Sequence, residues 1–94
     1  MKDEVAFFRK SAMRALAEVA EKGDAFAISA ASGLLKDPER SVRQAAVEAL
    51  ASIAKGDDFA IDMVSEHLED FDFDVREAAR VALSMIACPR RLDP

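Results

Sequence analysis

Residues 23–54, GDAFAISAASGLLKDPERSVRQAAVEALASIA, recur 33 residues later as residues 56–87, GDDFAIDMVSEHLEDFDFDVREAARVALSMIA. The two segments are identical at 16 of 32 positions. A repeat period in the thirties is typical of helical solenoids, in which stacked helix pairs bury a core that no single unit can form alone. The repeat therefore predicts an all-α superhelix and a scaffold that binds other molecules.

Apolar residues in each unit follow the three-and-four spacing of a helix with one buried face. The second half of each unit has the longer stripe: Val42, Ala46, Ala49, Leu50 and Ile53, and Val75, Ala79, Ala82, Leu83 and Ile86. Shorter stripes precede these: Phe26, Ala30, Ala31, Leu34 and Leu35, and Phe59, Met63, Val64 and Leu68. Each unit is expected to be a hairpin of helices of about 12 to 18 residues.

Glycine and aspartate mark the boundaries between units. Gly23 and Gly56 lie where a helix would end in a left-handed residue, and Asp24 and Asp57 follow as N-caps of the next helix. Inside the first unit Asp37-Pro38 is expected to cap the second helix in the same way, with the proline in its first turn. These signals place short polar turns between all helices.

The N-terminal segment repeats the second helix of a unit at an offset of 34 residues. Residues 4–22 are therefore expected to be the second helix of an earlier unit whose first helix is absent. The chain divides into five helices and about two and a half repeats within one domain, residues 1–94: a half repeat 3–22, repeats 23–55 and 56–88, and a tail 89–94.

The motif Asp-x4-[Val/Phe]-Arg-x-x-Ala occurs three times, starting at Asp3, Asp37 and Asp70. In this motif the chain resembles HEAT repeats, in particular the HEAT-like repeats of the phycobilisome lyase type, over residues 3–87. The resemblance implies an α-α superhelix with the second helices on its concave side. It also implies a polar ladder between units, formed by Asp3, Arg9, Asp37, Arg43, Asp70 and Arg76. Tetratricopeptide and armadillo repeats are the alternatives for the architecture.

The composition is that of one folded domain, with 94 residues, 51% apolar and 33% charged. No apolar run is long enough to predict a membrane span, and the N-terminus lacks the pattern of a signal peptide. The single cysteine, Cys88, excludes an internal disulfide. These features favour a cytoplasmic protein.

The charge of the chain is unevenly distributed. Residues 1–56 contain nine Lys and Arg against eight Asp and Glu, a net +1, whereas residues 57–94 contain four against ten, a net −6. The acidic part is interpreted as a solvated face or as a docking patch for a basic segment. Nucleic acid is not expected as a partner, because only Lys2, Arg9, Lys10 and Arg14 approach a basic face.

The candidate catalytic and metal-binding residues do not have the spacing that these sites require. A calcium loop starting at Asp70 would need Gly at its sixth and Glu at its twelfth position, where the chain has Val75 and Val81. His67 is the only histidine and has Glu66 as its single neighbouring ligand. Ser65 and Cys88 have no geometry for a nucleophile with His67 as base. We expect no enzyme, no metal and no cofactor.

Differences between the repeats carry more functional information than their identities. Leu34, Gly33 and Val47 correspond to His67, Glu66 and Arg80, which is interpreted as polar capping of the last unit. In the opposite direction, Glu48, Ser52 and Lys55 correspond to the apolar residues Val81, Met85 and Cys88. We expect Val81 and Met85 to contact a partner or a second copy of the chain.

The first helix has an apolar stripe that lacks the usual cover of a first helix: Val5, Phe8, Ala12, Leu16 and Val19, with Phe7 and Met13 beside it. Three arrangements would cover it: packing on the next unit, pairing of two chains, or continuation of a longer solenoid. We expect a homodimer through Val5, Phe7, Phe8, Ala12 and Leu16, because a half repeat leaves an open edge.

The function expected from the sequence is a non-enzymatic scaffold that binds another protein through its second helices. The residues of this face are Lys10, Arg14, Gln44, Glu48, Ser52, Glu77, Val81 and Met85. The alternative is an accessory subunit or fragment of a bilin lyase-like or other HEAT-like enzyme, which would need a pocket with convergent polar groups.

Overall fold

The computed structural model describes residues 2–87, with side chains from residue 4 onward, and this part of the chain contains helices and no strand. The predictions for the Asp3 side chain, for Cys88 and for the tail 89–94 lie outside the described residues. The elements are α1 (Lys2–Val19), α2 (Ala25–Gly33), the 3₁₀ helix η1 (Leu34–Lys36), α3 (Arg40–Ile53), α4 (Asp58–Ser65), the 3₁₀ helix η2 (Glu66–Glu69) and α5 (Phe73–Ile86). The all-α repeat fold with five α-helices is confirmed.

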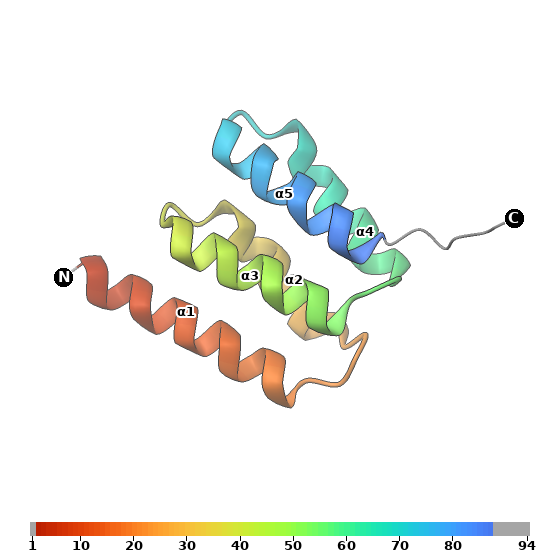
Figure 1. Cartoon of the computed structure of the whole chain (residues 1–94), viewed down its shortest axis with the longest axis horizontal. Coiled ribbons are helices and arrows are strands. Elements are labelled where there is room, and N and C mark those ends of the chain that lie inside the picture. Colours follow the sequence, from red (N-terminus) through yellow and green to blue (C-terminus); the bar gives the residue numbers. More distant parts are fainter. Residues whose placement is uncertain (1, 88–94) are drawn as a thin grey trace, which may run out of the picture.

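The helices form two layers (Figure 1). The second helices α1, α3 and α5 lie side by side in one layer, and the first helices α2 and α4 lie behind them. The central helix α3 packs against α1, α2 and α5. The units therefore meet through α3 and also through the contact between α2 and α4, and the surface of the second-helix layer runs across three helices.

The first helices are shorter than expected, with 9 residues in α2 and 8 in α4. Each is closed by a 3₁₀ turn with i to i+3 hydrogen bonds, a tightening that is frequent at helix ends. The Asp37 N–H donates to the Leu34 carbonyl at 3.1 Å, and the Asp70 N–H donates to the His67 carbonyl at 3.2 Å. These turns end the first helices and lead into the second ones.

The turns between units have the predicted glycine and aspartate geometry. Gly23 and Gly56 have φ angles of 81° and 76°, in the left-handed region that favours glycine. Asp24 accepts a hydrogen bond from the Ala27 N–H at 2.9 Å, and Asp57 accepts the equivalent bond at 3.0 Å.

The boundary glycines also tie the two ends of each unit together, which the sequence did not indicate. The Gly23 N–H donates to the Ile53 carbonyl and the Gly56 N–H donates to the Ile86 carbonyl, both at 2.7 Å. Both carbonyls lie at helix C-termini, where no partner exists within the helix. Each bond therefore fixes the start of one unit to the end of its second helix.

The prediction that Asp37-Pro38 caps α3 is wrong. The N-cap residue is Glu39, which makes no side-chain capping bond, so Pro38 precedes the helix. The Asp37 carboxylate instead accepts the Glu39 N–H at 2.9 Å and closes a turn of the Asx type. In the second unit Asp72 is the N-cap and accepts from the Asp74 N–H at 2.8 Å.

The core follows the second-helix stripes closely and the first-helix stripes only in part. On α3 the whole predicted stripe is buried, and on α5 only Leu83 is half-buried. On α2, however, Phe26 is 74% exposed, and Ala27, Ile28 and Ala31 face the core instead. Phe59 in α4 is likewise exposed. Both phenylalanines lie in the first turn, one position before the buried face.

Candidate functional site

The second-helix layer contains a cleft between α3 and α5. Its volume is about 550 Å³. The lining residues are Arg40, Arg43, Gln44, Val47, Glu48, Asp74, Glu77, Ala78, Val81 and Met85. The structure therefore brings together five of the eight residues predicted for protein binding: Gln44, Glu48, Glu77, Val81 and Met85.

The spacing of the lining residues explains how two helices build the cleft. On α3, Arg40, Gln44, Val47 and Glu48 lie on successive turns of one helix face, because residues three and four apart are neighbours there. On α5 the corresponding residues are Asp74, Glu77, Ala78, Val81 and Met85. The same spacing could have identified Arg40, Val47, Asp74 and Ala78, which the sequence analysis missed.

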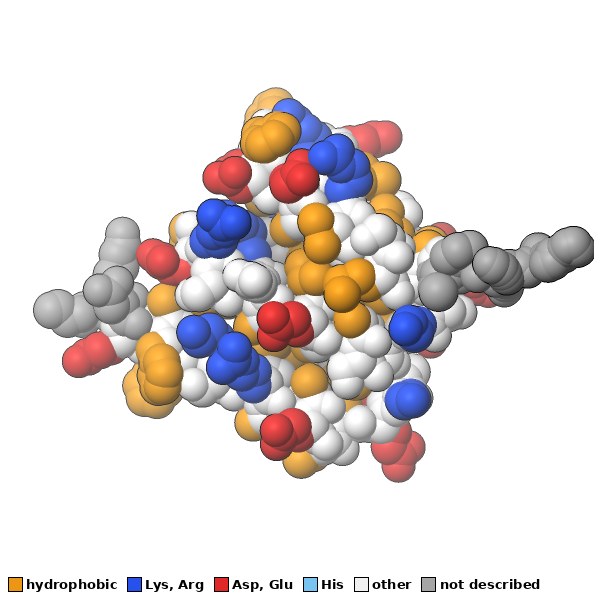
Figure 2. Space-filling model, in the orientation of Figure 1, with side chains coloured by type: hydrophobic (Ala, Val, Ile, Leu, Met, Phe, Trp, Pro, Cys, Tyr) orange, Lys and Arg blue, Asp and Glu red, His pale blue; other side chains and the backbone are white. Residues whose placement is uncertain are grey.

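The apolar part of the cleft is formed by four side chains. Val47 is buried and Ala78 is half-buried, whereas Val81 and Met85 are 44% and 40% exposed. Hydrophobic side chains lie near the middle of this face, between α3 and α5 (Figure 2). A methionine adapts its shape readily, so this patch can bury an apolar side chain of a partner.

Charged groups surround the apolar patch. Arg43 donates to the Asp37 carbonyl at 2.8 Å, and its Nη2 lies 4.0 Å from the exposed Asp74 carboxylate. Glu77 is ion-paired with Arg80 at 2.6 Å. The hydrogen bond to the Asp37 carbonyl thus fixes the position of Arg43. Glu48 is exposed and forms no ion pair in the part of the chain that the structure describes.

The remaining predicted binding residues lie outside the cleft. Lys10 and Arg14 are on α1, and Figure 2 shows Lys and Arg side chains gathered over the N-terminal halves of α1 and α3. Ser52 lines a smaller hollow of about 480 Å³ near the C-terminus of α3, together with Lys22 and Lys55. The second-helix layer therefore has an apolar cleft at one side and a basic area at the other.

One rung of the predicted polar ladder is formed as expected. Arg9 donates to the two Asp37 carboxylate oxygens from Nε at 2.5 Å and from Nη2 at 2.9 Å. The Asp37 side chain is 4% exposed. Burial by itself would raise the pKa of Asp37, but the hydrogen bonds from Arg9 and the Glu39 N–H and the charges of Arg9 and Arg43 together lower it. The same hydrogen bond raises the pKa of Arg9.

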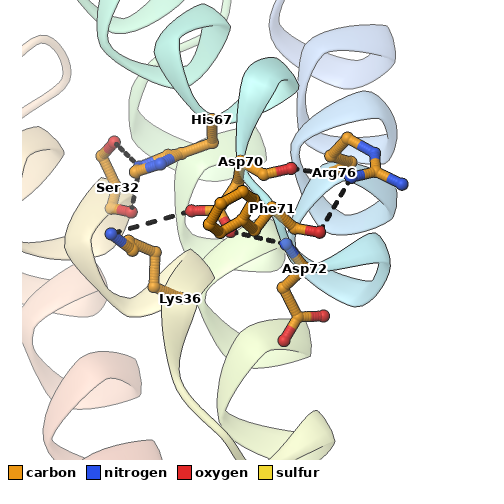
Figure 3. Close-up of polar contacts among 7 residues, drawn as sticks. All are labelled: Ser32, Lys36, His67, Asp70, Phe71, Asp72 and Arg76. Atoms are coloured by element: carbon orange, nitrogen blue, oxygen red, sulfur yellow. Dashed lines mark hydrogen bonds and ion pairs between the residues drawn. The ribbon is translucent and has the colours of Figure 1, made fainter.

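The second rung differs from the prediction. Arg43 forms no hydrogen bond or ion pair with the Asp70 carboxylate, since its guanidinium is occupied by the Asp37 carbonyl. Lys36 approaches that carboxylate instead, at 3.7 Å (Figure 3). Arg76 donates to the backbone carbonyls of Asp70 at 2.7 Å and Phe71 at 3.0 Å. At the first junction the ladder is therefore a bidentate ion pair between Arg9 and Asp37, and at the second it consists of separate contacts.

His67 links two units, so its interpretation as a cap of the open end is wrong. Its Nε2 lies 3.0 Å from the Ser32 carbonyl and 3.3 Å from the Ser32 hydroxyl (Figure 3). A carbonyl only accepts, so the imidazole carries its proton on Nε2 in the first of these bonds. Ser32 is buried, and the histidine therefore satisfies a polar group between α2 and η2.

Polar residues that were considered for chemistry have structural partners. The Ser65 hydroxyl donates to the Ile61 carbonyl at 2.6 Å within its own helix. Within residues 2–87, no group of three or more His, Cys, Asp or Glu side chains lies in an arrangement that could hold a metal ion. Among the same residues, no helix has the length and apolar character needed to cross a membrane.

Comparison with known proteins identifies the repeat. The family model described as HEAT repeats matches residues 2–84, from α1 into α5. No curated protein and no solved structure matches the chain. The family match covers most of the chain and agrees with the observed layers of paired helices. The chain therefore belongs to the HEAT-repeat family.

Proposed function

We propose that the chain is a non-enzymatic scaffold that binds another protein in the cleft between α3 and α5. The observation that supports this is the pair Val81 and Met85, which leaves apolar surface open beside Gln44 and Glu48. In the preceding repeat the positions of Val81 and Met85 are occupied by Glu48 and Ser52. The apolar surface is thus a departure from the repeat.

The chemistry of the cleft suits a partner with an apolar anchor. Protein interfaces obtain most of their binding energy from a few side chains that are fully desolvated at the centre, with polar groups around them. Here Val47 and Ala78 are the less exposed apolar lining residues, Val81 and Met85 are exposed on α5, and Glu48 is exposed on α3. A basic residue of the partner next to its apolar anchor would complement Glu48.

The repeat itself supports a finer relationship. The spacing from Asp37 to Arg43 and from Asp70 to Arg76 is that of the HEAT-like repeats of the phycobilisome lyase type, and we infer that this chain is related to them through the repeat. The relationship concerns the architecture, and the proposed role remains binding without catalysis.

The experiment compares protein capture from a native lysate by three forms of the full chain. The variant Val81→Glu/Met85→Glu places two charges in the cleft. The control Phe26→Glu/Phe59→Glu makes the same change at two exposed residues of the first-helix layer. We expect the wild type and the control to retain one partner that the cleft variant loses, with an affinity at least about tenfold lower. Equal capture of the same partners by all three forms would contradict the proposal.

A further inference from the structure

The first helix exposes positions that are buried in the other two second helices. At the offset of 34 residues, Phe8 corresponds to Val42 and Val19 corresponds to Ile53. Val42 and Ile53 are buried because α2 and η1 pack along α3. On α1 the equivalent residues Phe8 and Val19 are 72% and 78% exposed. No helix within residues 2–87 covers this face of α1.

The exposed residues form one straight stripe, which we call the α1 stripe: Val5, Phe8, Ala12, Leu16 and Val19. Their spacings of 3, 4, 4 and 3 residues are symmetric about Ala12. With about 100° per residue, all five lie within about 40° of the direction of Ala12. Leu16 is half-buried at the edge of the core, and the other four are exposed.

Two residues that the sequence placed with the stripe lie elsewhere on α1. Phe7 is exposed. At about 100° of rotation per residue, it lies about 140° around the helix from Ala12 and so points away from the stripe. Met13 is buried against the core and faces the rest of the stack. Phe7 is therefore removed from the predicted self-association surface, and it provides a matched control for Phe8.

The other end of the stack has exposed apolar side chains, among them Phe71 and Phe73, but it is also charged. On α5, Arg80 occupies the position of the buried residues Met13 and Val47, and it is ion-paired with Glu77. That end also belongs to the acidic part of the chain, with a net charge of −6 over residues 57–94. A head-to-tail stack of copies would therefore bring charged groups next to α1.

A second α1 stripe is a better match. Because the stripe is symmetric about Ala12, a second copy can face it in either direction with Ala12 opposite Ala12. The small central residue allows the two helices to approach closely. Both open faces are covered at once, as in a closed two-fold dimer. The two acidic ends then point away from each other, which avoids like-charge repulsion.

We propose that two copies of the chain pair through the α1 stripe about a two-fold axis that passes beside Ala12. The interface is separate from the cleft between α3 and α5, so each copy keeps its cleft available for a partner. The dimer would present two clefts, and this proposal does not depend on what the clefts bind.

The first experiment measures the mass of the full chain by light scattering over about a hundredfold range of concentration. We expect a dimer for the wild type and for Phe7→Glu, and a monomer for Phe8→Glu. Phe7 and Phe8 are both exposed, so neither change removes core packing, and unfolding curves will show whether both variants are folded. A monomeric wild type, or equal behaviour of the two variants, would overturn the proposal.

The second experiment is a cysteine cross-link on the Cys88→Ser background, which removes the natural thiol. Ala12→Cys is expected to form a disulfide-linked dimer under mild oxidation, because the two residues face each other in either orientation of the helices. Arg14→Cys, two residues along α1 and off the stripe, is the control and is expected to remain largely monomeric. Equal cross-linking at the two positions would contradict the interface.

Discussion

The two junctions between successive units share the same kind of apolar core and differ in their polar contacts. At the first junction, Arg9 places two nitrogens on the buried carboxylate of Asp37. At the second, Lys36 lies 3.7 Å from Asp70 and His67 bonds to the preceding unit. A repeated pair of residue types thus does not produce a repeated contact, because the atoms that a long side chain reaches depend on its neighbours.

The difference has a consequence for stability. At the first junction the polar contacts converge on one carboxylate, which is buried and also closes the turn before α3. At the second junction the contacts are spread over several groups that are more exposed. We therefore expect the first junction to be sensitive to a single polar substitution and the second to depend mainly on apolar packing.

The largest effect is expected from the apolar core that both junctions share. Leu50 is fully buried in α3, whereas the equivalent Leu83 of α5 is half-buried. Leu50→Ala should lower the free energy of unfolding by about 2–5 kcal/mol, since it removes transfer energy and leaves a cavity. Leu83→Ala should lower the free energy of unfolding by clearly less. Urea unfolding followed by circular dichroism measures both, and equal losses would contradict the difference in burial between the two leucines.

The next largest effect on stability should differ between the two junctions. Asp37→Ala removes the bidentate ion pair with Arg9 and the turn bond from Glu39, and it should lower the Tm by about 5–10 °C. Asp70→Ala removes the distant contact with Lys36 and one turn bond, so its effect should be smaller. Thermal unfolding of the two variants tests the order, and a larger loss for Asp70→Ala would reverse the comparison.

The pH dependence of stability should be traceable to Asp37. Its pKa is lower in the folded chain than in the unfolded chain, so the folded state binds fewer protons. The stabilisation is present above the ordinary pKa of about 3.9 and is lost as the pH falls through the lower folded value. Asp37→Asn should flatten the fall in stability below about pH 4. Asp62→Asn, at an exposed residue of α4, is the control, and its stability should depend on pH in the same way as that of the wild type.

The sequence predicted those features of the fold that depend on local chemistry and periodicity. Gly23 has the left-handed backbone and Asp24 caps the next helix, because both depend on residues close in the chain. The stripe of α3 is buried as a whole, because a long apolar stripe has only one way to face the core. The short first helices gave less information, and Phe26 was wrongly placed in the core.

Contacts between units could not be predicted, because they depend on three-dimensional neighbours. The equivalents Arg9 and Arg43 have the same type and the same spacing from an aspartate. Arg9 reaches the motif aspartate of the next unit, Asp37, whereas Arg43 lies 4.0 Å from Asp74 and forms no contact with the Asp70 carboxylate. His67 was expected at the open end and instead bonds to Ser32. The cleft was predicted in part, since helical spacing groups Val81 with Met85 but does not show which residues of α3 lie opposite them.

A smaller effect is expected at His67. The variant His67→Leu restores the residue of the preceding repeat, Leu34, and removes the bonds to the Ser32 carbonyl and hydroxyl. Loss of these bonds should cost about 0.5–1.5 kcal/mol, since the buried Ser32 is left with fewer partners. Glu66→Ala, at the exposed neighbouring residue, controls for changes in η2 itself. A gain in stability for His67→Leu would mean that apolar packing outweighs the bridge between units.

The smallest effect is expected for Lys36→Ala. The Lys36 side chain is 57% exposed and its Nζ lies 3.7 Å from the Asp70 carboxylate, so water and salt screen the attraction. Holding a long flexible side chain in one position also costs entropy, and the substitution should change stability by no more than about 0.5 kcal/mol. Unfolding in low and high salt measures this contribution, which should vanish in high salt. If Lys36→Ala were as damaging as Asp37→Ala, the second junction would depend on a single polar contact as the first one does.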